Sequence, residues 1–253
     1  MPRHGLARVL NRLGLCSRSQ AQALVREGRV RVNGSVILDP DAPADAARDR
    51  IEVDGAAATA ATKVYVALNK PRGYVTTASD EQGRETVYTL LQDIQLPQAR
   101  WLAPVGRLDK ASEGLLLFSN DSAWAARLTD PLTHLPKTYH VQIDALPDAP
   151  LLQRMREGID DGGERLSVVA VRELRRGEKN AWLEVVLDEG RNRQIRRLLA
   201  AFDIAVLRLV RVAIGSLELG ELPKGKWRIL GSEEAQRLLP AAAGRASSKQ
   251  GSG

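Results

Sequence analysis

One aspartate of the chain stands where a loop can hold a reactive carboxylate. Asp109 lies beside Arg107 in the segment PVGRLDKASEG, residues 104–114, and the apolar run LLLF at 115–118 predicts a buried strand directly behind it. A rigid strand behind and a glycine-bounded loop in front suit a carboxylate that must reach a substrate. An aspartate in a turn or in a surface ion pair would give the same short pattern, so both interpretations stay open for this segment alone.

Two further segments bring cations to the ends of predicted strands. The turn NKPRG at 69–73 follows an apolar strand and displays Lys70 and Arg72, because proline and glycine force a turn there. The segment EGRNRQIRRLL at 189–199 follows an alternating strand at 182–187 and predicts an arginine-rich helix. Within residues 191–211 a single acidic residue, Asp203, faces six arginines: Arg191, Arg193, Arg196, Arg197, Arg208 and Arg211. Such guanidinium groups can orient a carboxylate or bind phosphate, although helix charges in solvent give a similar run.

The start of the chain predicts a separate small module. Apolar residues at helical spacing over 6–13 indicate one helix, and Ser17 or Ser19 can cap a second. Alternating strands follow at 29–32 and 50–53, each ending in an Asn-Gly or Asp-Gly turn. The alanine-rich residues 56–62 lack turn chemistry and anchoring side chains, which indicates an interdomain tether.

Charge and composition point to a nucleic-acid partner. The net charge is +6, and residues 1–35 alone hold seven arginines against one acidic residue, Glu27. A basic module on a balanced body favours RNA or DNA binding, with a solvated, solubilising arm as the alternative. One cysteine, Cys16, and three scattered histidines exclude a disulfide framework and a multi-thiolate or histidine metal site. No segment predicts a signal peptide or a membrane span, so we expect a cytoplasmic protein.

The N-terminal segment LNRLGLCSRSQAQALVREGRVRVNG at 10–34, followed by DRIEVDG at 49–55, resembles the S4 RNA-binding domain. In that family the second helix and the following loop contact folded RNA through its phosphates. The resemblance therefore implies RNA contacts for Arg18, Arg29, Arg31 and Asn33. Such contacts would supply affinity and orientation rather than base recognition. A solvated surface charge remains the alternative for any single arginine.

Five segments in order resemble the bacterial ribosomal RNA pseudouridine synthases of the RsuA/RluB-like branch. They are NKP at 69–71, GRLDKASEGLLLFSND at 106–121, KTY at 137–139, EGRNRQIRR at 189–197 and RLVRVAIGSLELGELPKGKWRIL at 208–230. The resemblance implies an isomerase that cuts the bond from ribose C1′ to uracil N1, turns the base and rejoins it through C5. This reaction has no net redox change, so no cofactor is expected.

The same resemblance implies three catalytic residues. Asp109 matches the family's essential aspartate nucleophile, and Arg196 matches the arginine that keeps this carboxylate ionised and oriented. Tyr139 matches the aromatic ring that stacks on the target uracil. Whether the aspartate forms a covalent adduct or assists an elimination is left open by the sequence.

Further residues are implied to contact RNA around the site. A stacked uridine must be flipped out to reach the carboxylate, at a cost of a few kcal/mol, and Arg107 matches a residue that helps to fill the vacated space. Lys70 and Lys137 are expected to contact phosphates, with structural or solvated lysines as the alternative. Asn192 and Arg193 replace an aromatic–histidine pair of some relatives, which favours a 23S over a 16S rRNA target.

The sequence thus predicts an α+β protein: an S4 module at 1–60, a catalytic domain at 63–240 on a mixed, mainly antiparallel sheet, and a disordered tail at 241–253. We expect a monomer whose partner is ribosomal RNA or a ribosomal assembly intermediate. A non-catalytic ribosome-associated RNA-binding protein is the main alternative, and a DNA regulator is a distant third. The joint presence of Asp109, Tyr139 and Arg196 favours the enzyme.

Overall fold

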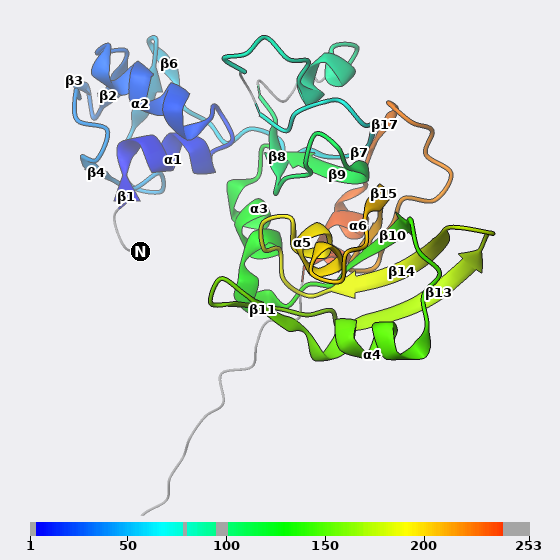
Figure 1. Ribbon diagram of the computed structural model, residues 1–253. Coiled ribbons are helices and arrows are strands. Elements are labelled where there is room, and N and C mark those ends of the chain that lie inside the picture. Colours follow the sequence, from blue (N-terminus) through cyan, green and yellow to red (C-terminus); the bar gives the residue numbers. More distant parts are fainter. Residues whose placement is uncertain (1–3, 78–79, 95–100, 240–253) are drawn as a thin grey trace, which may run out of the picture.

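The computed structural model describes residues 4–77, 80–94 and 101–239. It confirms the predicted α+β class: a small N-terminal module of helices and short strands, followed by a larger body built on a mixed sheet (Figure 1). The predicted tail at 241–253 lies outside the described residues. Within the described ranges, the helices are too short or too polar to cross a membrane.

The N-terminal module packs two helices against a small sheet. Its elements are β1 (His4–Gly5), α1 (Leu6–Arg12), α2 (Arg18–Arg26), β2 (Val30–Val32), β3 (Ser35–Val36), β4 (Pro43–Ala44), β5 (Ile51–Val53) and β6 (Ala56–Ala57). The strand order of the sheet is β3-β2-β5-β6, and β1 pairs separately with β4. Ser17 caps α2 as predicted: its hydroxyl accepts from the N–H of Gln20, whose side chain accepts from the N–H of Ser17.

The body is organised around a nine-stranded sheet. Seven strands lie in the order β13-β14-β10-β15-β9-β7-β17, while β8 pairs with β9 and β16 with β15. All described pairs in this sheet are antiparallel except β9 with β15. The strands are β7 (Tyr65–Lys70), β8 (Ala103–Val105), β9 (Glu113–Ser119), β10 (Lys137–Ile143), β13 (Ala170–Arg176), β14 (Ala181–Leu187), β15 (Val206–Ile214), β16 (Leu217–Glu218) and β17 (Trp227–Ile229).

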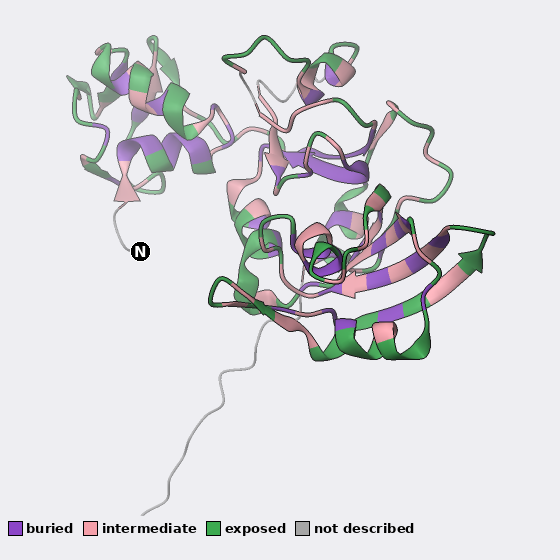
Figure 2. Ribbon diagram, in the orientation of Figure 1, coloured by how far each residue is buried: buried purple, intermediate pink, exposed green. Residues whose placement is uncertain are grey.

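Helices and a hairpin complete the body. They are η1 (Val87–Leu91), α3 (Ser122–Thr129), η2 (Pro131–Thr133), α4 (Ala149–Glu157), the hairpin β11 (Ile159–Asp161) with β12 (Glu164–Leu166), α5 (Gln194–Ala200) and α6 (Ser232–Arg237). One apolar cluster joins Met155 of α4 and Leu198 of α5 to Leu183 of β14, and a second joins Trp124 of α3 and Ala235 of α6 to the sheet. Strands β7 and β9 carry residues of both clusters, so they are buried along their whole length (Figure 2).

The predicted tether is more ordered than its composition indicated. Ala56 and Ala57 form β6 against β5, and the N–H of Ala61 donates to the carbonyl of Leu13 at 2.8 Å. The Lys63 ammonium donates to the carbonyl of Arg12, at the end of α1, also at 2.8 Å. These residues supply backbone hydrogen bonds that composition does not reveal, and they fasten the linker to the first module.

Candidate active site

The loop that carries Asp109 is held from behind by a buried lysine. Lys70 is 0% exposed, and its ammonium donates to the main-chain carbonyls of Pro71 at 3.1 Å, Asp109 at 3.0 Å and Ser112 at 2.8 Å. Burial lowers the pKa of Lys70 to about 8, while the charges of Asp109 and Glu113 oppose this shift. A phosphate cannot reach such an ammonium, so the expected phosphate contact of Lys70 is wrong and the structural alternative describes it.

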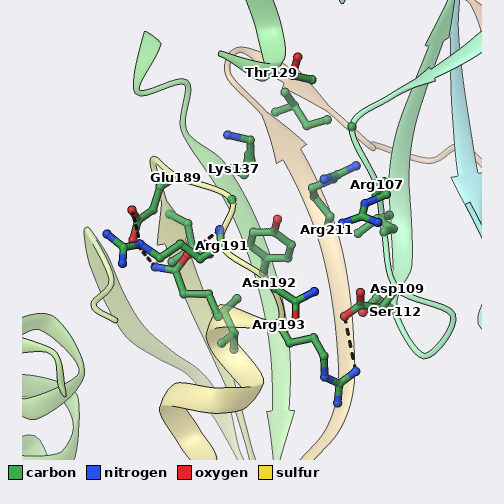
Figure 3. Close-up of a pocket in the computed structure, with 18 of the residues that line it drawn as sticks. Arg107, Asp109, Ser112, Thr129, Lys137, Glu189, Arg191, Asn192, Arg193 and Arg211 are labelled. Atoms are coloured by element: carbon green, nitrogen blue, oxygen red, sulfur yellow. Dashed lines mark hydrogen bonds and ion pairs between the residues drawn. The ribbon is translucent and has the colours of Figure 1, made fainter. Parts of the chain in front are cut away.

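The loop faces a cavity of about 560 Å³ that collects half of the predicted site residues. Its walls come from the loop after β8, the start of β10, the loop after β14, the start of α5 and the end of β15. Five predicted residues line it: Arg107, Asp109, Lys137, Tyr139 and Arg196. Figure 3 shows Asp109 and Arg193 on one side of this cavity and Lys137 on another. Its volume is typical of a site for a small molecule or a single nucleotide residue.

Two arginines of the motif after β14 flank Asp109 in different ways. Arg193 Nη1 lies 3.7 Å from Asp109 Oδ2, and this is the ion pair drawn in Figure 3. Arg196 instead donates from Nη2 to the carbonyl of Ala111 and from Nη1 to that of Val206, both at 3.2 Å. Burial lowers the pKa of Arg196, and the nearby charge of Asp109 opposes that shift. Arg193 is therefore the nearer ionic partner, and Arg196 ties the aspartate loop to β15.

Arg193 adopts an unusual backbone conformation for this contact. Its φ is 48°, in the left-handed region, and it forms the N-cap of α5. Left-handed backbone costs a non-glycine residue roughly 1 kcal/mol or more, so the surrounding loop must compensate for it. The sequence run did not distinguish Arg193 from Arg196, because the predicted helix included both.

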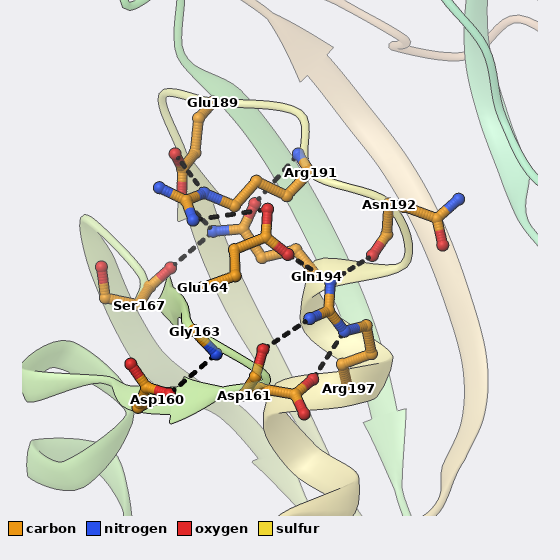
Figure 4. A network of polar contacts seen from close by, with 10 residues as sticks. All are labelled: Asp160, Asp161, Gly163, Glu164, Ser167, Glu189, Arg191, Asn192, Gln194 and Arg197. Atoms are coloured by element: carbon orange, nitrogen blue, oxygen red, sulfur yellow. Dashed lines mark hydrogen bonds and ion pairs between the residues drawn. The ribbon is translucent and has the colours of Figure 1, made fainter.

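A network of polar contacts ties the same loop to the β11–β12 hairpin (Figure 4). Glu164 of β12 accepts from Arg197 at 2.6 Å and lies 3.4 Å from Arg191. Gln194 donates to the Glu189 carboxylate and to the carbonyl of Ser167. The network fastens both sides of Arg193 to the β11–β12 hairpin, which sequence reasoning did not connect with the site.

Tyr139 and Lys137 line the cavity from β10. Tyr139 is 8% exposed and faces Arg211 across the β10–β15 pairing. The Lys137 ammonium donates to the carbonyl of Leu135 at 2.9 Å. Burial, followed by the charge of Arg211, lowers the pKa of Lys137. Arg211 is 4% exposed and lines the cavity, although the sequence placed it only in the general arginine cluster.

The four predicted RNA contacts of the N-terminal module do not line this cavity. Arg18 and Arg31 are exposed. Arg29 is also exposed, but its guanidinium forms a bidentate pair with Asp54 at 2.7 and 2.8 Å. Asn33 has a φ of 52°, and its side chain accepts from the N–H of Arg50 and donates to Asp49. Asn33 and Arg29 thus have structural partners within the module.

Metal ligands do not converge anywhere in the described part of the chain. No group of three or more histidine, cysteine, aspartate or glutamate side chains there is arranged to hold a metal ion.

Comparison with known proteins places these features in a family. Residues 64–201 match the RNA pseudouridylate synthase family, and residues 5–51 match the S4 domain. An uncharacterized RNA pseudouridine synthase of Aquifex aeolicus is 38% identical over 92% of this chain and 93% of its own length. Ribosomal large subunit pseudouridine synthase B of Bacillus subtilis is 34% identical over 92% and 94%. A crystal structure of a pseudouridylate synthase, 29% identical, covers 94% of this chain and all of its own, with a TM-score of 0.64. The chain therefore belongs to the RNA pseudouridine synthase family and carries an N-terminal S4 domain.

Proposed function

We propose that this protein isomerises one specific uridine of 23S ribosomal RNA to pseudouridine, with Asp109 as the nucleophile. One observation carries the proposal: the Asp109 carboxylate, 40% exposed, faces the Arg193 guanidinium in a cavity that a buried tyrosine also lines. The large-subunit name of the Bacillus subtilis relative supports the choice of 23S over 16S RNA. The substrate also favours a cytoplasmic location, where bacterial ribosomes assemble.

The proposed role of each site residue follows from its position. Lys70 fixes the main chain of Asp109, so that the carboxylate meets its target without first being ordered. Arg193 holds a positive charge beside it, and Arg196 secures the following residues through the carbonyl of Ala111. Tyr139, which is buried and lines the cavity, offers a ring for stacking on the uracil.

The uridine must leave its stack to enter. Arg107 is exposed and lines the cavity, which supports the proposal that it fills the gap left by the flipped nucleotide. Lys137 is half-buried and lines the cavity, and we propose that it contacts the sugar and phosphate of the incoming nucleotide. The S4 module adds electrostatic anchoring through Arg18 and Arg31, and we propose that a single chain suffices for the reaction.

The deciding experiment measures tritium release from C5-labelled uridine in ribosomal RNA. Asp109→Asn keeps the size of the side chain but removes the nucleophile, so we expect release to stop while RNA binding persists. Asp188→Asn, a change of another cavity carboxylate, is the matched control and should keep most of the activity. Equal release by the native chain and Asp109→Asn would refute the catalytic assignment.

A further inference from the structure

Arg211 is a buried cation whose guanidinium is only partly hydrogen-bonded within the described residues. The side chain is 4% exposed, and its Nε donates to the carbonyl of Leu115 at 2.7 Å. Its Nη2 is buried and has no hydrogen-bond partner among the described residues. Buried polar groups are nearly always paired, and an unpaired charged donor is costly, so this nitrogen indicates a ligand that arrives from outside.

Strand pairing on both sides fixes the backbone of Arg211. It pairs with Gly114 in the parallel β9–β15 contact, and a Cβ on Gly114 would lie 2.2 Å from the Arg211 carbonyl oxygen. On its other side, Arg211 lies opposite Tyr139 in the β10–β15 pairing, and both side chains line the cavity. Figure 3 shows Arg211 within the cavity, in the space between Lys137 and Arg107.

We propose that Arg211 donates a hydrogen bond from Nη2 to a carbonyl oxygen of the target uracil, both before and after the base turns. The inference rests on the proposed function. The depth of the residue selects the base rather than a phosphate: Arg107 is exposed and the Arg193 side chain is 50% exposed, whereas Arg211 is almost fully buried. The base is the part of a flipped nucleotide that goes deepest, while its phosphates stay joined to the strand at the rim.

The arginine guanidinium donates hydrogen bonds and does not accept them, and this matches the symmetry of uracil. Turning the ring by half a revolution about its N3–C6 axis exchanges N1 with C5 and also exchanges O2 with O4. Both oxygens are acceptors, so one fixed guanidinium nitrogen finds the same partner in either orientation. Cytosine carries an amino donor at C4 and would oppose Arg211 in one of the two orientations. Arg211 therefore contributes to selection of uridine as well as to its binding.

The same contact stabilises charge during the reaction. When the C1′–N1 bond breaks, its electron pair stays with the base, and the negative charge spreads over N1, O2 and O4. A cation at a carbonyl oxygen lowers the energy of that state. While the base turns, C1′ is bonded to the Asp109 carboxylate, which displaced N1. C5 then bonds to C1′ as the bond from C1′ to Asp109 breaks, C5 loses its proton and N1 gains one, so the atoms and electrons balance without a further reactant. The contact is therefore stronger in the transition state than in the bound substrate.

The test uses the full-length protein and a stem–loop RNA made around the uridine that it modifies. Arg211→Met removes the donors and keeps an unbranched stem of similar volume to the aliphatic part of arginine, and we expect the single-turnover rate to fall about 100-fold. The Kd for RNA should change little, because phosphate contacts elsewhere dominate it, and its dependence on salt should stay the same. Arg208→Met, which alters an arginine on the opposite face of the same strand, is the control and should react within about threefold of the native rate.

Sulfur substitution in the RNA tests the exchange of O2 and O4 directly. Sulfur is a weaker acceptor, so 2-thiouridine and 4-thiouridine should each slow the native protein. In Arg211→Met both slowing factors should shrink, by about threefold or more, because the donor that senses the oxygen is gone. Arg211→Lys, which keeps a charged donor, provides a second variant should the methionine variant unfold, and its thio effects should stay closer to the native ones.

Each contrary outcome has a distinct meaning. Unchanged thio effects in both variants, or a raised Kd with a flatter salt slope, would show that Arg211 binds a phosphate or serves only the fold, and would overturn the inference alone. A native protein that forms no pseudouridine in ribosomal RNA would overturn the proposed function, and the inference with it.

Discussion

Lys70 and Arg211 are buried cations, and main-chain carbonyls accept hydrogen bonds from both. Three carbonyls accept from the Lys70 ammonium, and one accepts from Arg211 Nε. Carbonyl dipoles offset only part of the cost of burying a cation, and this is why burial lowers the pKa of Lys70 to about 8. The protonation state of Lys70 is therefore sensitive to alkaline pH, although the residue touches no substrate.

This sensitivity predicts an alkaline limit to activity. As pH rises through about 8, Lys70 loses its proton, and an amine with two N–H groups must serve three carbonyls. We expect kcat to fall in that range because the Asp109 loop loosens. Lys70→Met should start from a lower kcat and lack this pH dependence. Native activity that stays level up to pH 9.5 would contradict the prediction.

The free energy of unfolding should depend on the protonation of Lys70 in the opposite direction to the activity. The folded pKa is lower than the ordinary value of 10.5, so between about pH 8 and 10.5 the unfolded chain binds more protons at this position. The contribution of Lys70 to the free energy of unfolding therefore rises with pH over that window. Urea titrations of the native protein and Lys70→Met across the window separate the two effects.

Individual residues show where sequence reasoning reaches its limit. The types and order of Asp109, Tyr139 and Lys137 were sufficient to predict that they share one cavity. The burial of Lys70 was not predictable from its turn, because it depends on the β7–β9 pairing and on layers that cover both faces. The pairing of Arg29 with Asp54 likewise depends on strands that meet across the module.

At the scale of elements, the parallel contact between β9 and β15 determines the geometry of the site. It brings the strand behind Asp109 against the strand that carries Arg211, and Gly114 allows the close approach. Gly114 has a φ of +102°, a conformation that favours glycine. The strands near the site follow from local sequence patterns. The parallel pairing of β9 with β15 joins segments far apart in the sequence, so no single segment predicts it.

Gly114→Ala should therefore destabilise the protein severely. Its Cβ would lie 2.2 Å from a backbone oxygen that cannot move without breaking the strand pairing, so we expect a loss of at least about 3 kcal/mol. Gly73→Ala is a close control, because Gly73 has nearly the same φ, +105°, with open space around it. Chemical denaturation of both variants isolates the steric part, and equal losses would contradict it.

Helices and strands with strong local signals were predicted well. The capping box of α2 and the buried strand β9 follow from short-range patterns. The arginine-rich helix predicted within residues 189–199 is present as α5, which begins at Gln194 because Arg193 takes a left-handed conformation. The loop is held by Glu164 of the β11–β12 hairpin, about thirty positions earlier, and such a contact is absent from local sequence.

At the scale of the whole molecule, the net positive charge and the candidate active site lie in different parts of the chain. The net charge of +6 is matched by the excess of arginines in residues 1–35, whereas the candidate active-site cavity lies in the body, whose charges balance. This division suits an enzyme that attracts RNA with one part and reacts with it in another. It also allows affinity and rate to be altered independently.

Arg18→Ala and Arg31→Ala should weaken RNA binding through the electrostatic part alone. Both side chains are exposed, so each change should reduce the slope of log Kd against log salt by about 1 and leave the single-turnover rate at saturating protein unchanged. Arg29→Ala is the control within the module, because its guanidinium already pairs with Asp54. A salt slope that does not change in either of the first two variants would contradict the anchoring role.

The linker between the two parts is fastened at both ends. On one side Ala61 and Lys63 bond to the carbonyls that end α1, and on the other the Asn120 side chain bonds to Thr62 and Val64. A linker that is hydrogen-bonded at both ends keeps the distance between the S4 domain and the Asp109 carboxylate constant. Among uridines of similar local structure, we therefore expect the protein to modify the one that lies at this distance from the docking site of the S4 domain.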